Sequence, residues 1–303
     1  PQKQMTPESR ANYEKALRQA LQAGYDTLQK ESATSVDAVE AAIKVLEDSP
    51  LFNAGKGAVF THDGRNELDA SIMEGKEKMA GAVAGVTRTK NPISAARAVM
   101  EKSPHVMMTG DGADRFAIAS GVREVSPVYF WTEERWKALG EMLKEEEEAA
   151  KKGKTSKRDE TTKKRYYGTV GAVALDRHGN LAAGTSTGGM TNKRHGRIGD
   201  SPIIGAGTYA ENGACGVSCT GHGEIFIRNA VAYDVVARMK YGKERSVGDA
   251  ARAVLGKLPT EEGGVGGLIA LDNEGNAALE FDGDGMYRGT VTDKGEIEVA
   301  IYR

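Results

Sequence analysis

The sequence predicts a layered α+β fold in which β-sheets pack against helices. Apolar residues recur at helical spacing near the N-terminus and again after residue 223, and small and β-branched runs bounded by turn residues lie between and beyond them. Strands on both sides of a run of helices are typical of layered sandwiches. The chain has 303 residues, of which 39% are hydrophobic, so a sizeable core can form.

The first half of the chain alternates between predicted helices and short strands. One helix begins after the N-cap Thr6, with a proline at its first position, and continues to Leu28; a second begins at Ser35 and ends before Pro50. Further helices are predicted at 91–100 and 111–120. Strands are predicted at 57–61, 68–73, 80–86 and 106–108.

The second half begins with a predicted hairpin, in which strands at 169–176 and 181–185 flank a turn that ends in Gly179-Asn180. A second Asp-x-x-Gly-Asn turn at 272–276 predicts a similar hairpin. Between the hairpins, apolar residues at every fourth position predict a helix at 224–239, and another follows at 247–255.

A charged, low-complexity segment runs directly into the strand that begins at Thr169. Residues 144–167 hold a glutamate run followed by a segment rich in lysine and arginine. Such a segment buries too little apolar surface to fold, so we expect a disordered tether. A cut just before Thr169 would leave a hydroxyl nucleophile and an α-amine base on one residue. The junction therefore suggests a terminal threonine nucleophile.

Composition argues against several other classes of protein. The formal charge of −2 shows no basic excess for nucleic acid, and no run of about 18 apolar residues is long enough to span a membrane. Cys215 and Cys219 are too few for a disulfide framework and lack a histidine at zinc-finger spacing. We interpret them as buried thiols.

Several motifs occur in one order along roughly residues 12 to 288, outside the charged tether. They are Pro50–Gly55, Ser103–Met108, Gly168–Ala174, Thr185–Lys193, Gly196–Pro202, Ser218–Gly221 and Gly223-Glu224. Together they resemble the plant-type L-asparaginases, also called isoaspartyl peptidases. The resemblance implies a four-layer αββα sandwich of the N-terminal-nucleophile hydrolase type.

The resemblance also implies an activity and a subunit organisation. The chain would cut itself between Gly168 and Thr169 into an α subunit, residues 1–168, and a β subunit, residues 169–303, which together form one domain. The product would be a homodimer of αβ units. It would hydrolyse L-asparagine to L-aspartate and ammonia, and cleave β-aspartyl dipeptides, through an acyl-enzyme that needs no cofactor for its chemistry.

Four residues carry the chemistry that the resemblance implies. Thr169 would be the nucleophile, and its α-amine, with a reference pKa near 8, would be the base. Thr187 would orient the nucleophile. Thr220 and Gly221 resemble the oxyanion hole of the family, one through its hydroxyl and the other through its backbone N–H.

A second set of residues would recognise the substrate. Arg197 offers a rigid fork to the substrate carboxylate, and Asp200 offers the opposite charge to its ammonium group. The backbone of Gly221 and the carbonyl of Gly223 would complete this site. His222 departs from the smaller hydroxyl residue that the family pattern leads us to expect, which affects the shape of the leaving-group side.

The loop that follows the second predicted helix resembles one that binds sodium through backbone carbonyls in bacterial members of the family. Carbonyl oxygens suit a hard cation. The matching positions are Leu46, Glu47, Ser49, Phe52, Ala54 and Lys56. We therefore expect a structural sodium ion there.

Three alternative functions remain open at this point. A glycosylasparaginase shares the mechanism, but its family has a sequence closer to Asp-Thr-Ile-Gly at the nucleophile, in place of Gly168-Thr169-Val170-Gly171. The chain could also be an uncleaved, inactive binding protein of the same fold, or a threonine protease that acts on folded proteins. Hydrolysis tests with asparagine, a β-aspartyl dipeptide and a peptide library would separate them.

The N-terminus bears on the expected location. The chain begins with Pro1, and the His-Gly-Gly-Ala-Gly-like turn that usually ends the opening strand of the family does not occur in it. We expect a truncated N-terminus, compatible with a removed signal peptide, and otherwise a cytoplasmic protein.

Overall fold

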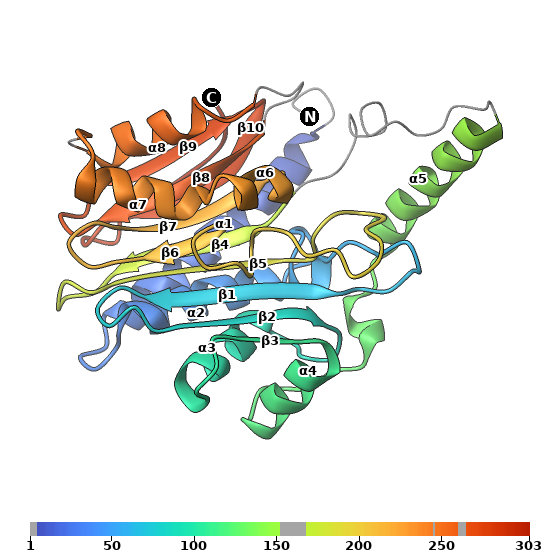
Figure 1. Cartoon of the computed structure of the whole chain (residues 1–303), viewed down its shortest axis with the longest axis horizontal. Coiled ribbons are helices and arrows are strands. Elements are labelled where there is room, and N and C mark those ends of the chain that lie inside the picture. The colour runs from blue at the N-terminus through green and yellow to red at the C-terminus, as the bar shows by residue number, and fades with distance from the viewer. Residues whose placement is uncertain (1–4, 152–167, 245, 260–264) are drawn as a thin grey trace.

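The computed structural model describes residues 5–151, 168–244, 246–259 and 265–303 (Figure 1). Within these ranges the chain mixes helices with strands that form several sheets. The helices are α1 (Pro7–Leu28), α2 (Ser35–Glu47), α3 (Pro92–Lys102), α4 (Gly110–Ala119), α5 (Glu133–Lys151), α6 (Gly223–Arg228), α7 (Val231–Tyr241) and α8 (Val247–Leu255), with 3₁₀ turns η2 (Gly55–Gly57) and η3 (Pro127–Phe130).

The strands form three sheets within the described residues. The strands are β1 (Leu68–Glu74), β2 (Ala80–Val86), β3 (Met107–Thr109), β4 (Val170–Leu175), β5 (Leu181–Thr187), β6 (Thr208–Ala210), β7 (Cys215–Gly221), β8 (Gly266–Asp272), β9 (Ala277–Asp282), β10 (Gly285–Val291) and β11 (Ile297–Tyr302). Five strands pair in the order β3-β2-β1-β5-β4, four in the order β6-β7-β8-β9, and two form the hairpin β10-β11.

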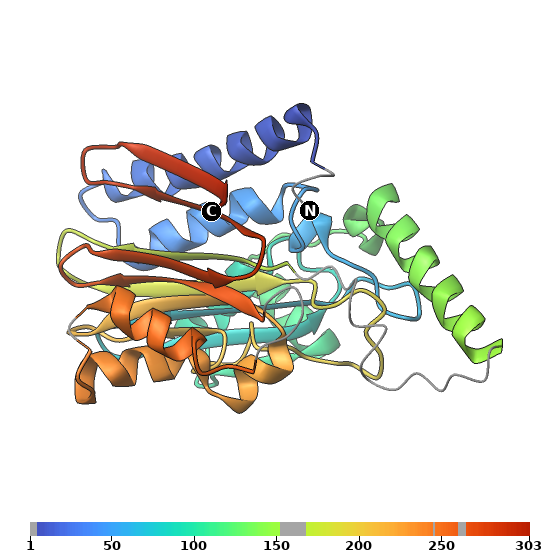
Figure 2. The same ribbon diagram turned by 90° about the horizontal axis from the view of Figure 1, so that it is seen from above.

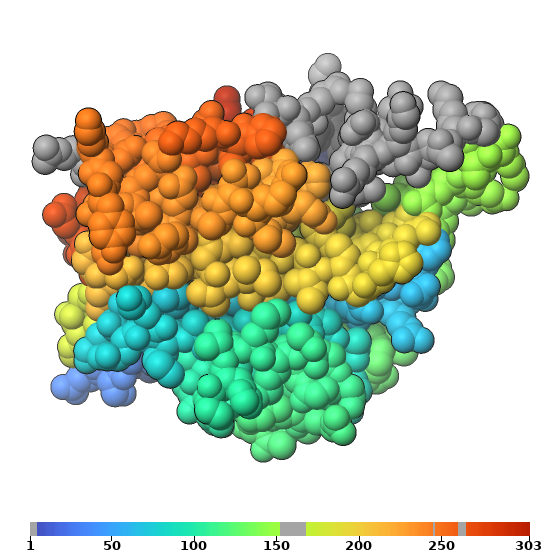
Figure 3. All heavy atoms as spheres, in the orientation of Figure 1, coloured from blue at the N-terminus to red at the C-terminus, as the bar shows by residue number. Residues whose placement is uncertain are grey.

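Helices cover both of the larger sheets. In the five-stranded sheet α2 contacts β4 and β5, and α3 contacts β1 and β2, whereas α7 and α8 contact the four-stranded sheet. The two sheets contact each other through β4 and β5 on one side and β7 on the other. The space-filling view shows the same succession as bands of colour, from α3 and α4 in green to α6, α7 and α8 in orange (Figure 3).

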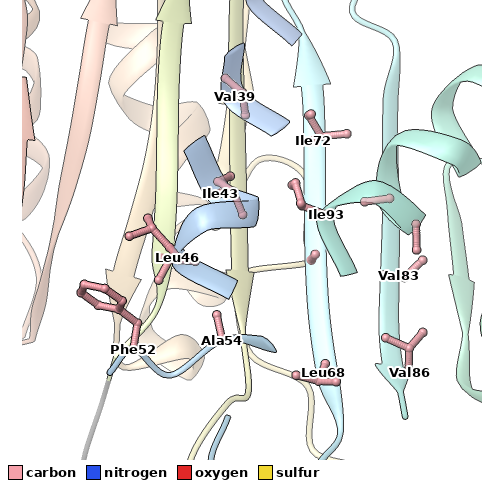
Figure 4. Packing of buried hydrophobic residues seen from close by; sticks show 14 of the residues in the cluster. Val39, Ile43, Leu46, Phe52, Ala54, Leu68, Ile72, Val83, Val86 and Ile93 are labelled. Carbon is pink, nitrogen blue, oxygen red and sulfur yellow. The ribbon is translucent and has the colours of Figure 1, made fainter. Parts of the chain in front are cut away.

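The packing of α2 and α3 on the first sheet explains why these segments form amphipathic helices. Val39 and Ile43 from α2 and Ile93 from α3 lie over the strands in the close view of the core, and all three are fully buried (Figure 4). A Cβ atom placed on Gly184 of β5 would lie only 2.7 Å from Val39 Cγ1. The absence of a side chain at Gly184 therefore lets α2 approach the strand closely.

The first helix is covered by the last hairpin, although more than 250 residues separate them in the sequence. Figure 2 shows α1 beside β10 and β11, and the contacts between these elements agree. The rings of Tyr13 and Tyr287 stack with their centroids 4.3 Å apart, and Arg18 donates to the carbonyl of Ile297. The two ends of the chain thus close the same side of the molecule.

Most predicted elements are confirmed, including both turns of the predicted hairpins and the capping of α1 by Thr6. The predicted strand at 57–61 is wrong: η2 occupies its start, and the only ladder contact is an isolated bridge between Thr61 and Lys193. The N–H of Val59 donates instead to the side chain of Asn53. Local hydrogen bonds therefore replace the expected ladder.

The predicted helix at 224–239 is also wrong as a single element. It is divided into α6 and α7 at Ala230, whose φ of 47° is left-handed. The amides of Ala232 and Tyr233 donate to the carbonyls of Ala206 and Gly205. Because a neighbouring loop satisfies these first-turn N–H groups, a new helix can begin there.

The prediction of a disordered tether at 144–167 is wrong for its first part, because residues 144–151 form the last two turns of α5. Glutamate, lysine and alanine are good helix formers, and Glu147 pairs with Lys151 one turn later at 2.7 Å. Glu146 further accepts hydrogen bonds from Asn192 and Arg194. The rest of the predicted tether, 152–167, lies outside the described residues.

No helix in the described part of the chain has the length and apolar character to cross a membrane.

The close packing of α2 predicts the effect of a cavity. Ile43→Ala should lower the free energy of unfolding by about 3 kcal/mol, because the buried side chain leaves a void between α2 and the sheet. Urea denaturation measures this loss. The control Val128→Ala removes a side chain that is 77% exposed and should change stability by less than about 0.5 kcal/mol. Equal losses in both variants would contradict the assignment.

Candidate active site

One pocket collects most of the residues that the sequence singled out. It lies where the end of β5 and the junction before β4 meet the loop 188–201 and the end of β7. Its lining consists of Gly168, Thr169, Thr187, Gly189, Met190, Arg197, Gly199, Asp200, Ser201 and Gly221. The structure therefore brings together the predicted cleavage site, two of the predicted catalytic threonines and both charged residues.

The two threonines in the pocket contact each other directly. The Thr169 hydroxyl donates to Thr187 Oγ1 over 3.1 Å, and Thr187 in turn donates to the carbonyl of Gly168 over 3.2 Å. The N–H of Gly189 donates to Thr187 Oγ1 at 3.0 Å. Antiparallel pairing of β4 with β5 places Thr187 beside Thr169, since Val170 is opposite Ser186. Thr187 is thus held in one orientation, with its oxygen toward Thr169.

Asn53 is a residue of this site that the sequence did not single out. Its side-chain amide donates to the carbonyl of Gly168 at 2.8 Å and to that of Gly189 at 2.7 Å. Its Oδ1 accepts from the N–H of Val59, which fixes the direction in which the amide points. The carbonyl before Thr169 therefore has two side-chain donors. An Asn in a loop before Ala-Gly carries no sequence signal for such distant partners.

Arg197 is held by Glu224, a second residue to which the sequence assigned no role. The Nε and one Nη of Arg197 donate to the two carboxylate oxygens of Glu224, each over 2.9 Å. His222 Nε2 lies 3.2 Å from the same carboxylate. Burial opposes the ionisation of Glu224, but hydrogen bonds from His222 and Arg197 outweigh it and hold the pKa of Glu224 well below its ordinary value. The pair fixes the plane of the guanidinium group.

Asp200 lies buried at the pocket with one carboxylate oxygen, Oδ2, that has no hydrogen-bond partner in the described structure. Burial raises its pKa to about 7, partly offset by its own backbone N–H and by Arg197. Asp69, opposite Thr187 across β1 and β5, is a second buried carboxylate, and burial raises its pKa as well, although the charge of Lys193 opposes this. Asp200 thus gives the pocket one buried carboxylate able to accept a cation, whereas Asp69 lies outside the pocket lining.

The remaining predicted residues flank the pocket. Thr220 is the last residue but one of β7 and lies opposite Gly267; Gly221, which ends the strand, lines the pocket with a φ of 151°. A Cβ atom on Gly221 would come within 2.4 Å of the carbonyl of Val265, so that only glycine fits. A Cβ on Gly223 would lie 2.7 Å from a guanidinium nitrogen of Arg197. The start of α6 therefore packs directly against the charged residues.

The predicted sodium loop runs from the end of α2 into η2 and carries Asn53, which contacts the pocket residues Gly168 and Gly189. Two of its carbonyls lie close to glycines. A Cβ atom on Gly55 would lie 2.3 Å from the carbonyl oxygen of Glu47, and a Cβ atom on Gly57 would lie 2.0 Å from that of Phe52. The guanidinium of Arg135 donates to the carbonyls of Gly57 and Leu51 nearby. These two carbonyls are not among the predicted sodium ligands, so the sodium site stays a prediction.

Known proteins are similar to this chain over most of its length. The family model for Asparaginase (Asparaginase_2) matches residues 1–301. The chain belongs to this family. An isoaspartyl peptidase from Salmonella typhimurium is 50% identical over 291 residues, which cover 94% of this chain and 89% of that protein.

More distant relatives share the same names. A plant-type L-asparaginase from Pyrococcus abyssi is 44% identical over 283 residues, with 87% of this chain and 84% of the relative covered. An isoaspartyl peptidase/L-asparaginase from Homo sapiens is 44% identical over 267 residues, with coverage of 88% and 82%. The family predicted from the order of the motifs is therefore confirmed.

The side chain of Glu47, at the end of α2, leads to a pH prediction for the fold next to the site. Glu47 Oε1 accepts from Ser186 Oγ and from the N–H of Ile93, and burial raises its pKa from 4.5 to about 8. The neutral carboxyl is favoured in the fold, so its stabilisation is complete below pH 4.5 and is lost as the pH rises through 8.

Relative to Glu47→Gln, the wild type should lose on the order of 3 kcal/mol of unfolding free energy between pH 5 and pH 9. Chemical denaturation of both proteins across this range measures the difference. Parallel pH profiles would show that Glu47 does not titrate in the fold.

Proposed function

We propose that this chain is an autoprocessing threonine amidohydrolase that hydrolyses L-asparagine and β-aspartyl dipeptides. The observation that carries the proposal is the contact of the Thr169 hydroxyl with Thr187, at a chain junction that shares one pocket with Arg197 and Asp200. Membership of the asparaginase family, with relatives named isoaspartyl peptidase and L-asparaginase, supports the same substrates.

In the proposed self-cleavage, Thr169 Oγ1 attacks the carbonyl carbon of Gly168. Negative charge develops on the carbonyl oxygen, where Asn53 Nδ2 and the Thr187 hydroxyl already donate. The C–N bond breaks, the nitrogen takes up a proton and becomes the α-amine of Thr169, and an ester joins Gly168 to Thr169 Oγ1. Water then hydrolyses the ester and frees both the hydroxyl and the amine.

In the proposed hydrolysis, the freed Thr169 hydroxyl attacks the side-chain amide of the substrate while the α-amine accepts its proton. Thr220 and the N–H of Gly221 stabilise the oxyanion, and ammonia or an amino acid leaves. Water attacks the resulting β-aspartyl ester and releases aspartate. No step requires a cofactor.

Substrate recognition in this proposal depends on the charges at the pocket. Arg197, oriented by Glu224, binds the α-carboxylate, and Asp200 with the carbonyl of Gly223 binds the α-ammonium. The unpartnered Asp200 Oδ2 is the acceptor that an ammonium donor needs. Because the pKa of Asp200 is raised to about 7, the ammonium ion also favours its ionised form.

We also propose the finer architecture. Helices on the outer faces of two sheets that contact each other support a four-layer αββα sandwich, one domain shared by residues 1–168 and 169–303 after cleavage. Two such αβ units would form a homodimer. The carbonyls of Leu46, Glu47, Ser49, Phe52, Ala54 and Lys56 would hold a sodium ion, which would rigidify the loop that carries Asn53.

The alternatives are less well supported. A glycosylasparaginase-like amidase or an uncleaved binding protein of the same fold would use the same pocket, but the relatives carry the names isoaspartyl peptidase and L-asparaginase. A threonine protease for folded proteins needs an open cleft, whereas this pocket is bounded by buried Asp200 and Thr187.

The cleavage step is tested with variants of the nucleophile. Thr169→Ala should remain a single chain of 303 residues without amidase activity, whereas Thr169→Ser should still cleave because a hydroxyl remains. Mass spectrometry and N-terminal sequencing of the wild-type fragment should give Thr-Val-Gly-Ala-Val.

The cleavage test has a second arm in Asn53. Asn53→Ala removes one donor to the Gly168 carbonyl and should slow cleavage by about a hundredfold. A different new terminus, or full activity in Thr169→Ala, would exclude Thr169 as the nucleophile.

The recognition step is tested at Arg197 and Glu224. Glu224→Gln keeps the shape of the side chain but replaces one acceptor oxygen by a donor, so Arg197 loses its fixed orientation. The KM for asparagine should rise about tenfold, and Arg197→Ala should raise it further, by about a hundredfold. Neither change should slow self-cleavage, which uses no substrate carboxylate. Blocked cleavage in Arg197→Ala would instead give Arg197 a structural role.

A further inference from the structure

Four buried hydroxyl groups form a continuous chain of hydrogen bonds between the two larger sheets. Ser71 Oγ lies 2.7 Å from Thr208 Oγ1, Thr208 Oγ1 is 2.6 Å from Thr185 Oγ1, and Thr185 Oγ1 is 2.7 Å from Ser218 Oγ. All four side chains are at most 4% exposed. They come from β1, β6, β5 and β7, so this hydroxyl chain crosses from one sheet to the other.

One end of the hydroxyl chain lies beneath the strand of the nucleophile. Thr185 is opposite Gly171 in the pairing of β5 with β4. A Cβ atom on Gly171 would lie 2.0 Å from Ser218 Oγ and 2.9 Å from Ser218 Cβ, so Ser218 packs against the bare backbone of Gly171. The contact with Ser218 therefore sets the distance between β4 and the four-stranded sheet. Gly171 is two residues after Thr169, so this contact lies close to the nucleophile.

The other end holds the segment that carries Asp200. Ser71 Oγ lies 2.6 Å from the carbonyl oxygen of Ser201, and Thr185 Oγ1 lies 3.1 Å from that of Gly207. Each hydroxyl has one proton, so the four hydroxyls share four protons among these two carbonyl contacts and their three contacts with one another. A Cβ on Gly207 would lie 2.5 Å from the Asp200 carbonyl, so these two backbones are in contact. The hydroxyl chain thus fixes the recognition segment at two carbonyls.

We propose that Ser71, Thr185, Thr208 and Ser218 are positioning residues that set the distance between the nucleophile and the substrate-binding charges. The proposal rests on the proposed amidase function. Apolar side chains fill space between sheets without fixing one separation, whereas hydrogen bonds of 2.6 to 2.7 Å allow little displacement. Catalysis by a threonine depends strongly on such placement, since a shift of about 1 Å can cost roughly a hundredfold in rate.

The two ends should affect different kinetic constants. Ser71→Ala frees the Ser201 carbonyl and should raise the KM for asparagine about tenfold, with kcat and the rate of self-cleavage within about twofold of wild type. Ser218→Ala loosens the support of Gly171 and should lower kcat and slow self-cleavage about tenfold, with little change in KM.

Two controls separate this positioning role from a loss of stability. Thr89→Val removes an equally buried hydroxyl that contacts Asp114 away from the chain of four, and it should leave KM and kcat unchanged. Thr185→Ser keeps the central hydroxyl and should retain near wild-type constants, whereas Thr185→Val should change both.

Steady-state kinetics, cleavage time courses and melting curves of these variants decide the matter. A raised KM in Ser71→Ala together with a lowered kcat in Ser218→Ala supports the proposal. Constants within twofold of wild type in both, or a parallel loss of activity in both that follows their melting temperatures, would overturn it. A wild type that cleaves neither asparagine nor β-aspartyl dipeptides would instead refute the proposed function, and would show as inactivity before any variant is compared.

Discussion

The position of β5 between β1 and β4 is the constraint on which the rest of the site depends. Three consecutive hydroxyl residues end this strand, and each is fully or almost fully buried with different partners. Thr187 contacts Thr169 and the Gly168 carbonyl, Ser186 donates to Glu47 of α2, and Thr185 contacts Thr208 and Ser218. Because side chains alternate across a strand, Thr185 and Thr187 share the face toward the second sheet while Ser186 faces the helices. A shift of one residue in register would exchange these faces and dismantle the site.

The order of elements could be predicted from the sequence because the signals are local. Thr6 with Pro7, and the Asp-x-x-Gly-Asn turns, specify their structures through bonds to neighbours a few residues away. The division at Ala230 could not be predicted, since it depends on carbonyls of Gly205 and Ala206 that belong to a distant loop. Strand β7 was missed for a similar reason: its cysteine, glycine and serine residues are suited to close packing against other backbones rather than to high strand propensity.

The residues of the site likewise divide into those that the sequence could indicate and those that it could not. Thr169, Arg197 and Asp200 could be proposed as site residues because they lie in motifs with a recognisable order, and the structure places all three around one pocket. Asn53 and Glu224 lay within quoted motifs without a role, because what distinguishes them is a partner more than 20 residues away. Long-range hydrogen bonds leave no periodicity or spacing in a single sequence, whereas a threonine between a charged segment and an apolar strand can be recognised in it.

The acids at and near the pocket, of which Glu47 and Asp200 are buried and Glu224 is half-buried, show how one fold assigns different protonation states to similar groups. Glu224 stays ionised because His222 and Arg197 supply donors, whereas Glu47 and Asp200 have raised pKa values because burial outweighs the donors that they receive. Asp200 and Glu47 each keep one oxygen without a partner in the described structure, but their surroundings differ. Glu47 lies behind the strand, in contact with Ser186 and the N-terminus of α3, where a neutral acid can remain. Asp200 faces the pocket, where a cationic substrate would supply both the missing hydrogen bond and the missing charge. In the proposed recognition, the same desolvation that serves packing at Glu47 would select an ammonium-bearing ligand at Asp200.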